Sequence, residues 1–247
     1  MVNVRELFFD SGGQRCVADL YLPDDAPGLL PCVVMAHGGS GTKRLGLPKY
    51  AQKFAARGMA VLVFDYRHFG ASAGEPRQLI DIEEQRADYH AAISCARTQP
   101  GIDPDRIALW GTSLSGGHVL AVAARDAKLA AVVSQVPMID GWHRGRKLEQ
   151  RLDRDILRRT LQFTAAVRDV ARARLGLSPL LVPVVAGPGA LAVFTEPEAK
   201  TTFDALGGEA TGWRNELAPR FLLPPAALRK GQRPANCCAA LGVLGGQ

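Results

Sequence analysis

The sequence predicts an α/β fold, in which a mostly parallel sheet is covered by helices on both faces. Two observations carry this prediction. Strand-like and helix-like segments alternate through residues 1–140, and the strand-like runs are continuously apolar rather than alternating. Continuous apolar strands are typical of parallel sheets that are buried on both faces, because right-handed crossover helices cover each face.

The first elements follow from turn residues and apolar runs. "MVNVRELFFDSGGQR" indicates two strands joined by a turn at residues 11–13, which would add antiparallel strands at one edge of the sheet. "PCVVMAHGG", residues 31–39, is an apolar run that ends at glycines, as a buried strand does. "PKYAQKFAARG", residues 48–58, is typical of a short helix that begins near a proline and ends at a glycine.

The same alternation continues to residue 137. "MAVLVFDYR", residues 59–67, predicts a second buried strand, and residues 79–97 predict a longer amphipathic helix. "RIALWG", residues 106–111, predicts a third buried strand, and "SLSGGHVLAVAARD", residues 113–126, the helix that follows it. "KLAAVVSQVP", residues 128–137, predicts a fourth strand.

After Asp140 the alternation of strand-like and helix-like segments stops. Helical segments follow, then the proline-rich and glycine-rich stretch 178–199. We therefore expect a core at residues 1–140, a helical cap inserted over the carboxyl edge of the sheet at 141–221, and a partial return to the core or an aberrant tail at 222–247.

The composition excludes several classes of protein. Of 247 residues, 47% are hydrophobic and 22% charged, which argues against disorder. The apolar runs are too short to span a membrane, and the first residues lack the layout of a secretory signal, so a cytoplasmic location is expected. The five cysteines have no metal-type or disulfide-type spacing, which predicts reduced thiols and no metal site.

The net charge of +6 comes largely from arginines between residues 144 and 174. Nucleic acid or anionic lipid could bind such a run. The sequence favours a solvated helix face instead, with no nucleic-acid or membrane partner, and leaves homo-oligomerisation open. The apolar residues predicted on the opposite face are Leu148, Leu152, Ile156, Phe163, Val167 and Val170.

The chemistry is expected at "GTSLS", residues 111–115, which nearly matches the nucleophile elbow G-x-S-x-G. In that motif a sharp strand-to-helix turn exposes the serine, here Ser113, and the backbone N–H of the next residue, Leu114, faces the developing oxyanion. "AHGGSGTK" would supply a second N–H donor, Gly39 before Ser40. The alternatives are a plain helix start with Ser113 as N-cap, and glycines that only make a tight turn.

"HGGSGTK", "VFDYRHFGAS" and "GTSLSGG", in this order, resemble the α/β-hydrolase superfamily, most of all bacterial dienelactone-hydrolase-like and S15-peptidase-like enzymes. The resemblance implies an α/β-hydrolase fold and a small-molecule ester or related acyl substrate. It also implies an acyl-enzyme on Ser113, with neither metal nor organic cofactor. It further implies that His37 orders its loop and that the segment "DYRHFGAS" has a structural role. The alternative for this segment is that His68 acts as the catalytic base.

Members of this superfamily place an acid and then a histidine after the serine, but here no histidine follows His143. The chain therefore resembles a C-terminally truncated or frameshifted member. One interpretation is that Asp140 and His143 substitute for the missing acid and base. The alternative is that Asp140 only forms the N-cap of the next helix, at the hinge between the core and the inserted domain. We expect a serine hydrolase with weak or absent activity, and the alternative is a non-catalytic small-molecule binding protein on the same fold.

Overall fold

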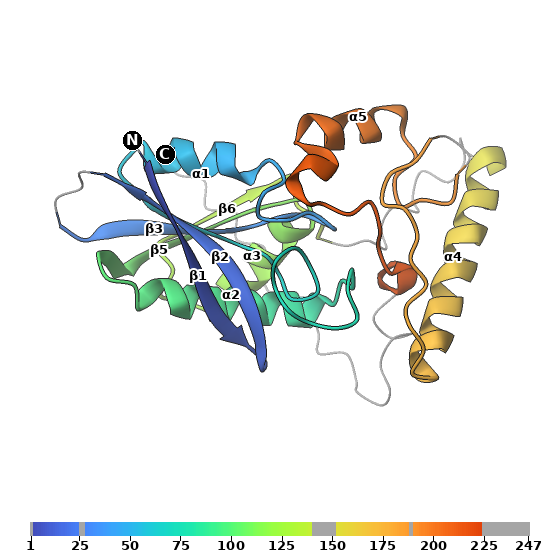
Figure 1. The fold of residues 1–247 in the computed structure, drawn as a ribbon, viewed down its shortest axis with the longest axis horizontal. Helices are drawn as coiled ribbons and strands as arrows, with labels where there is room; N and C mark the ends of the chain where they lie inside the picture. Colours follow the sequence, from blue (N-terminus) through green and yellow to red (C-terminus); the bar gives the residue numbers. More distant parts are fainter. Residues whose placement is uncertain (1, 25–27, 140–151, 188–189, 224–247) are drawn as a thin grey trace.

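The computed structural model describes residues 2–24, 28–139, 152–187 and 190–223, with the backbone alone at residues 152–159 (Figure 1). Its strands are β1 (Val2–Ser11), β2 (Gln14–Pro23), β3 (Leu30–Ala36), β4 (Ala60–Phe64), β5 (Ile102–Thr112) and β6 (Ala131–Gln135). Its helices are α1 (Leu47–Ala55), α2 (Ile82–Arg97), α3 (Leu114–Ala123), α4 (Leu152–Arg174), α5 (Pro197–Ala205) and the 3-10 turns η3 (Gly208–Thr211) and η4 (Pro219–Leu222). The predicted α/β fold is confirmed.

Within these residues the sheet has six strands in the order β1-β2-β4-β3-β5-β6. The β1–β2 and β2–β4 pairs are antiparallel, so the N-terminal hairpin extends one edge as predicted, and the other three pairs are parallel. In the central register Ala36 of β3 lies beside Phe64 of β4 and Gly111 of β5. The three central strands therefore end at the same level, and the loops that follow them meet at one edge.

The central strands are buried on both faces, as their continuous apolar runs predict. Val33 and Met35 pack with α1 in one core, whereas Val34 and Ala36 point to the core beneath α2 and α3. Figure 1 shows α1 on one face of the sheet and α2 with α3 on the other. Removal of apolar side chains from water on both faces is the main force that stabilises this sandwich of helices and sheet.

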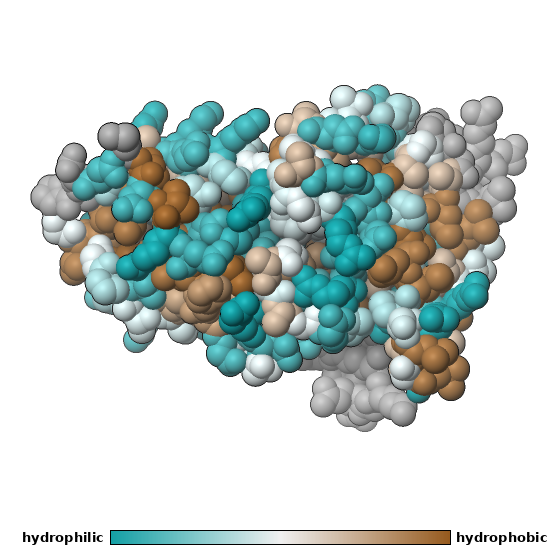
Figure 2. All heavy atoms as spheres, viewed as in Figure 1, coloured by the Kyte–Doolittle hydropathy of each residue, from teal (hydrophilic) through white to brown (hydrophobic). Residues whose placement is uncertain are grey.

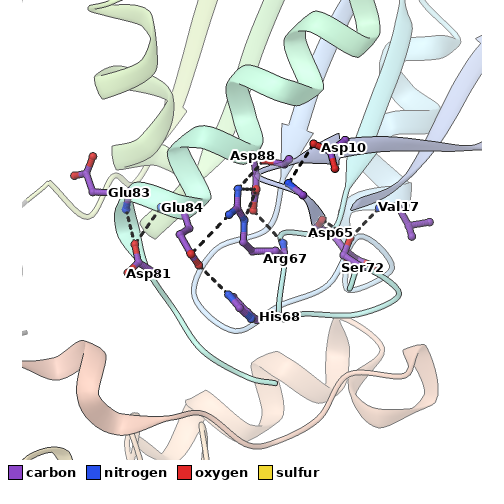
Figure 3. A network of polar contacts seen from close by, with 12 residues as sticks. Asp10, Val17, Asp65, Arg67, His68, Ser72, Asp81, Glu83, Glu84 and Asp88 are labelled. Carbon is purple, nitrogen blue, oxygen red and sulfur yellow. Dashed lines mark hydrogen bonds and ion pairs between the residues drawn. The ribbon is translucent and has the colours of Figure 1, made fainter. Parts of the chain in front are cut away.

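Helix α2 begins at Ile82 because Asp81 caps it. The Asp81 carboxylate accepts hydrogen bonds from the backbone N–H groups of Glu83 and Glu84, both at 3.0 Å, which satisfies donors that the helix leaves free (Figure 3). The cap fixes the point where the loop after β4 turns into the helix.

The chain after β6 forms α4 and α5 beyond the carboxyl ends of the parallel strands (Figure 1). The prediction that Phe163 and Val167 form the buried face of α4 is wrong, since they are 59% and 44% exposed. The buried face instead holds Ala165, Ala166 and Asp169. The Asp169 carboxylate determines this orientation, because it accepts hydrogen bonds from Leu180 N–H and from Arg220, a residue of η4.

Candidate functional site

Ser113 occupies a strained turn between β5 and α3. Its φ of 56° and ψ of −120° lie in a region that residues with a side chain rarely adopt. The backbone holds it there, because its N–H donates to the Gln135 carbonyl at 3.0 Å and its carbonyl accepts from Gly117 N–H and Met138 N–H. Ser113 caps no helix N–H, unlike an ordinary N-cap residue. The geometry is that of an elbow that presents a half-buried hydroxyl.

Small residues around the serine make this turn possible. A Cβ on Gly111 would lie 2.4 Å from the Ser115 carbonyl oxygen, and one on Gly117 would lie 2.2 Å from the Met138 carbonyl oxygen. Ser115 stands where the motif has its second glycine, and its side chain fits because it is bound. The Ser115 hydroxyl lies 2.9 Å from the Ala36 carbonyl and is fully buried. The expectation that the turn survives this replacement is confirmed.

The glycine-rich loop after β3 passes directly against the elbow. A Cβ on Gly38 would lie 3.2 Å from the Ser113 Cβ and 3.7 Å from its Oγ, whereas one on Gly39 would meet nothing within 4 Å. The loop is therefore closest to the serine at Gly38, and space remains at Gly39. The N–H of Leu114 belongs to the first turn of α3, whose donors have no partner within the helix. Leu114 and Gly39 as oxyanion donors stay predictions.

Two buried polar side chains hold this loop in place. The His37 ring donates from Nδ1 to the Gly38 carbonyl at 2.7 Å, and burial lowers the pKa of His37 to about 4, so the ring is neutral. The Asp65 carboxylate accepts from Lys43 N–H at 2.6 Å and from Ala71 N–H at 2.9 Å. It therefore joins the loops that follow β3 and β4. Burial raises the pKa of Asp65 to about 6, against the two hydrogen bonds, which lower it.

The Arg67 and His68 side chains of "DYRHFGAS" bind α2 rather than Ser113 (Figure 3). Arg67 Nε donates to the Asp88 carboxylate at 2.7 Å, and His68 Nε2 lies 2.8 Å from the Glu84 carboxylate. Asp88 is fully buried, so the ion pair with Arg67 is what compensates its charge. These contacts agree with the structural role that the resemblance implies for the segment.

Sequence reasoning missed the partners on α2. Asp88 and Tyr89 lie in the helix predicted from residues 79–97, but neither was singled out as functional. A signal was present, because Asp88 adjoins the apolar positions that the periodicity assigns to the buried face. An acidic residue there needs a cationic partner, and Arg67 is that partner.

Three of the described histidines, His37, His68 and His118, have ring partners other than Ser113. His118 lies on α3, and its Nε2 is 2.9 Å from the Gln85 amide oxygen. Burial lowers the pKa of His118 to about 3. Asp140 and His143 lie outside the described residues, although the chain that leads to them is in place, because Met138 N–H donates to the Ser113 carbonyl at 2.8 Å. The acid and base assignments stay predictions.

The described part of the chain holds free thiols, and it shows neither a cluster of potential metal ligands nor a helix that could span a membrane. Among the described residues Cys16, Cys32 and Cys95 are free thiols, and burial raises the pKa of each of them. No group of three or more potential metal ligands occurs in the part of the chain that the structure describes. None of the described helices has both the length and the apolar character needed to cross a bilayer.

Known proteins resemble this chain in sequence over most of its length. The family model of the X-Pro dipeptidyl-peptidase (S15 family) matches residues 12–156. The chain is 43% identical over 216 residues to the quorum-quenching protein AidA of Acinetobacter baumannii, covering 87% of this chain and 68% of that protein. It is 34% identical over 221 residues to the thiohydrolase aneE of Aspergillus aculeatus, covering 87% of this chain and 64% of that protein.

Solved structures agree with the sequence comparison. The α/β-hydrolase GrgF from Penicillium sp. sh18 superposes with a TM-score of 0.70 at 27% identity, over 89% of this chain and 71% of that one. The hypothetical protein PA2218 of Pseudomonas aeruginosa superposes with a TM-score of 0.67 at 25% identity, over 89% and 64%. The chain thus spans about two thirds of the length of these two relatives and two structures.

Proposed function

Because the chain belongs to the S15 family of X-Pro dipeptidyl-peptidases, within the α/β-hydrolase superfamily, we propose that it is a serine hydrolase of small acyl compounds. Ser113 is the nucleophile. The observation that carries the proposal is the strained turn at Ser113, packed against Gly38, because strain of this kind is retained where function needs it.

The proposed reaction has two steps. The Ser113 oxygen bonds to the acyl carbon while its proton passes to a base, and the bond to the leaving group breaks as that group takes up the proton. Water then attacks the acyl-enzyme in the same way and releases the acid. In each step the N–H groups of Leu114 and Gly39 donate to the oxyanion, and one such donor is worth about 3 kcal/mol.

We propose Asp140 and His143 as the acid and base. The support is positional: Met138, two residues before Asp140 in the sequence, donates its N–H to the Ser113 carbonyl. Among the other four histidines, His37, His68 and His118 have polar partners other than Ser113, and His90 lies on α2.

The names of two relatives support an acyl class for the substrate. One relative is a thiohydrolase and another is the polyketide transferase ATR5 of Stachybotrys chlorohalonatus, 33% identical over 159 residues. Thioester cleavage and acyl transfer both begin with attack on an acyl carbonyl. We therefore extend the proposed substrates from oxygen esters to thioesters.

A fluorophosphonate probe tests the proposal, because it reacts with an activated serine without needing turnover. We expect stoichiometric labelling of the unaltered chain, none in Ser113→Ala, and full labelling in the control Ser94→Ala, whose hydroxyl only bonds the His90 carbonyl. His143→Gln should slow labelling by orders of magnitude, and the matched His90→Gln should not. Absence of labelling in the unaltered chain would support the alternative, a non-catalytic binding protein.

A further inference from the structure

The Gly39 N–H, one of the two proposed oxyanion donors, lies in a part of the loop that side-chain packing does not hold. Gly39 is half-buried, and a Cβ there would meet nothing within 4 Å. Within the described residues, neither the Gly39 N–H nor the Ser40 N–H donates a hydrogen bond. A glycine in open space rotates easily about its backbone bonds. The direction of this N–H therefore depends on what holds the peptides on either side of it.

His37 holds the peptide on one side. Its Nδ1 donates to the Gly38 carbonyl at 2.7 Å, and this carbonyl shares a planar peptide group with the Gly39 N–H. The imidazole therefore restrains one end of that peptide group. Rotation about the bonds of Gly39 itself has to be restrained from the side of Ser40.

Trp213 supplies that second restraint. Its Nε1 donates to the Ser40 carbonyl at 2.8 Å, and among the described residues the indole is the one hydrogen-bond partner of this carbonyl. Ser40 has a φ of 61°, in the left-handed region that costs a residue with a Cβ about 1–2 kcal/mol. Without the indole N–H the strained Ser40 would be free to relax, and the peptide group between Gly39 and Ser40 would turn with it.

Trp213 is itself firmly held. It is 4% exposed, and its ring lies 4.8 Å from the ring of Phe203 on α5, at an interplanar angle of 30°. The outer surface of α5 is mostly hydrophilic or neutral in Figure 2, and Phe203 is half-buried beneath it. The end of α5 also packs on the loop before α1, because a Cβ on Gly46 would lie 2.7 Å from the Leu206 Cδ2. The indole donor is therefore rigid enough to orient the backbone that it binds.

We propose that Trp213 is a positioning residue for the oxyanion hole: its indole N–H holds the Ser40 carbonyl and, through it, the direction of the Gly39 N–H. This inference rests on the proposed function, because Gly39 is a donor to the oxyanion of the Ser113 reaction. The hydrogen bond joins residues that are 173 positions apart. It makes the geometry of the oxyanion hole depend on the part of the chain that follows α5.

The test replaces the Trp213 indole by a benzothiophene, which has the same ring shape but carries sulfur in place of the N–H. Trp110 is the matched control, because it is also 4% exposed and its indole N–H has no partner among the described residues. Benzothiophene at position 213 should slow fluorophosphonate labelling about tenfold, which is less than the roughly 10²–10³-fold loss on removing a whole oxyanion donor. Benzothiophene at position 110 should leave the rate unchanged.

Two further measurements separate positioning from packing. With a p-nitrophenyl ester the change at position 213 should lower kcat and leave KM nearly unchanged, because the oxyanion forms only in the transition state. Phe203→Leu disturbs the ring contact but keeps the indole N–H. It should lower the Tm more than the benzothiophene does and slow labelling less.

The direction of the Gly39 N–H is also measured without turnover, by residual dipolar couplings. The coupling of this N–H should change with benzothiophene at position 213 and stay the same with benzothiophene at position 110. If the unaltered chain is not labelled, the proposed function fails, and the couplings alone decide whether Trp213 holds the loop. The inference is overturned if the two benzothiophene variants are labelled at the same rate as the unaltered chain, or if the Gly39 coupling is the same in both.

Discussion

The Ser115 hydroxyl and the Tyr89 phenol are 2.8 Å apart in the core, where Ser115 also donates to the Ala36 carbonyl at 2.9 Å. Ser115 donates to Ala36, so its oxygen is free to accept from the phenol. The Tyr89 oxygen lies 3.2 Å from the Trp110 carbonyl as well. One serine thus joins the elbow to the end of β3 and to α2.

Removing this hydroxyl should destabilise the protein. Ser115→Ala should lower the free energy of unfolding by about 1–3 kcal/mol, because buried partners lose their hydrogen bonds, and Tyr89→Phe by about 1 kcal/mol. The double variant should lose less free energy of unfolding than the two single variants lose together, because both changes remove the same hydrogen bond. Urea unfolding measures all three, and strictly additive costs would contradict the geometry.

The strain at Ser113 predicts a difference between two inactive variants. Ser113→Gly should be more stable than Ser113→Ala by about 1 kcal/mol, because glycine adopts a φ of 56° without the steric cost of a Cβ. Neither variant should react with the fluorophosphonate. Equal unfolding midpoints would show that the turn is relaxed.

Glycines near the serine should differ in their tolerance of a methyl group. Gly111→Ala should lower the free energy of unfolding by several kcal/mol, because its Cβ would lie 2.4 Å from the Ser115 backbone oxygen. Gly39→Ala, with open space around the new Cβ, should change stability by less than about 1 kcal/mol. Thermal melting of the two variants, side by side, checks this. A mild effect of Gly111→Ala would argue against the tight turn.

Neutral buried histidines predict sensitivity to acid. The pKa of His118 is about 3 in the folded protein and near 6.5 in the unfolded chain, so in that window the unfolded state binds more protons. The stabilisation is complete above about pH 6.5 and falls by about 1.4 kcal/mol per pH unit as the pH drops towards 3. His37 acts in the same direction down to about pH 4, whereas Asp65, with its raised pKa of about 6, acts in the opposite direction.

The variant His118→Gln isolates the contribution of His118 to the pH dependence of the free energy of unfolding. Its glutamine can still donate to Gln85 but cannot titrate. Its free energy of unfolding should depend on pH less steeply than that of the unaltered chain below pH 6.5, by up to about 1.4 kcal/mol per pH unit. Urea titrations at a series of pH values give the two slopes. Identical slopes would mean that His118 becomes protonated in the folded state.

Among the described residues a buried ion pair joins α4 to η4. Asp169 is fully buried, and Arg220 donates to it from Nε at 2.6 Å and from a terminal nitrogen at 3.0 Å. Arg220→Met should destabilise the packing of α4 on η4 by about 3–5 kcal/mol, because it leaves a buried carboxylate uncompensated. The exposed Arg168→Met on the same helix serves as control. Hydrogen exchange of the α4 amides reports the effect, and equal protection in the two variants would refute it.

The sequence by itself determined the sheet, its hairpin edge and the elbow. These features depend on local patterns: apolar runs such as residues 31–36 and 60–64 must be buried on both faces, and glycines at fixed spacing around Ser113 allow a turn that other residues cannot make. A reader of the sequence could therefore name Ser113 and the loop of Gly39 before any coordinates.

Only the tertiary structure decided which side chains hold that site and which face of α4 is buried. The pairs Tyr89–Ser115, Asp88–Arg67 and Asp169–Arg220 join segments that are 21 to 51 residues apart, and sequence periodicity carries no record of such partners. For the same reason periodicity misplaced Phe163 and Val167, since a buried carboxylate with its arginine outweighed the apolar pattern in orienting the helix. Local sequence patterns therefore determine where helices and strands form, and long-range polar pairs determine which face of a helix is buried.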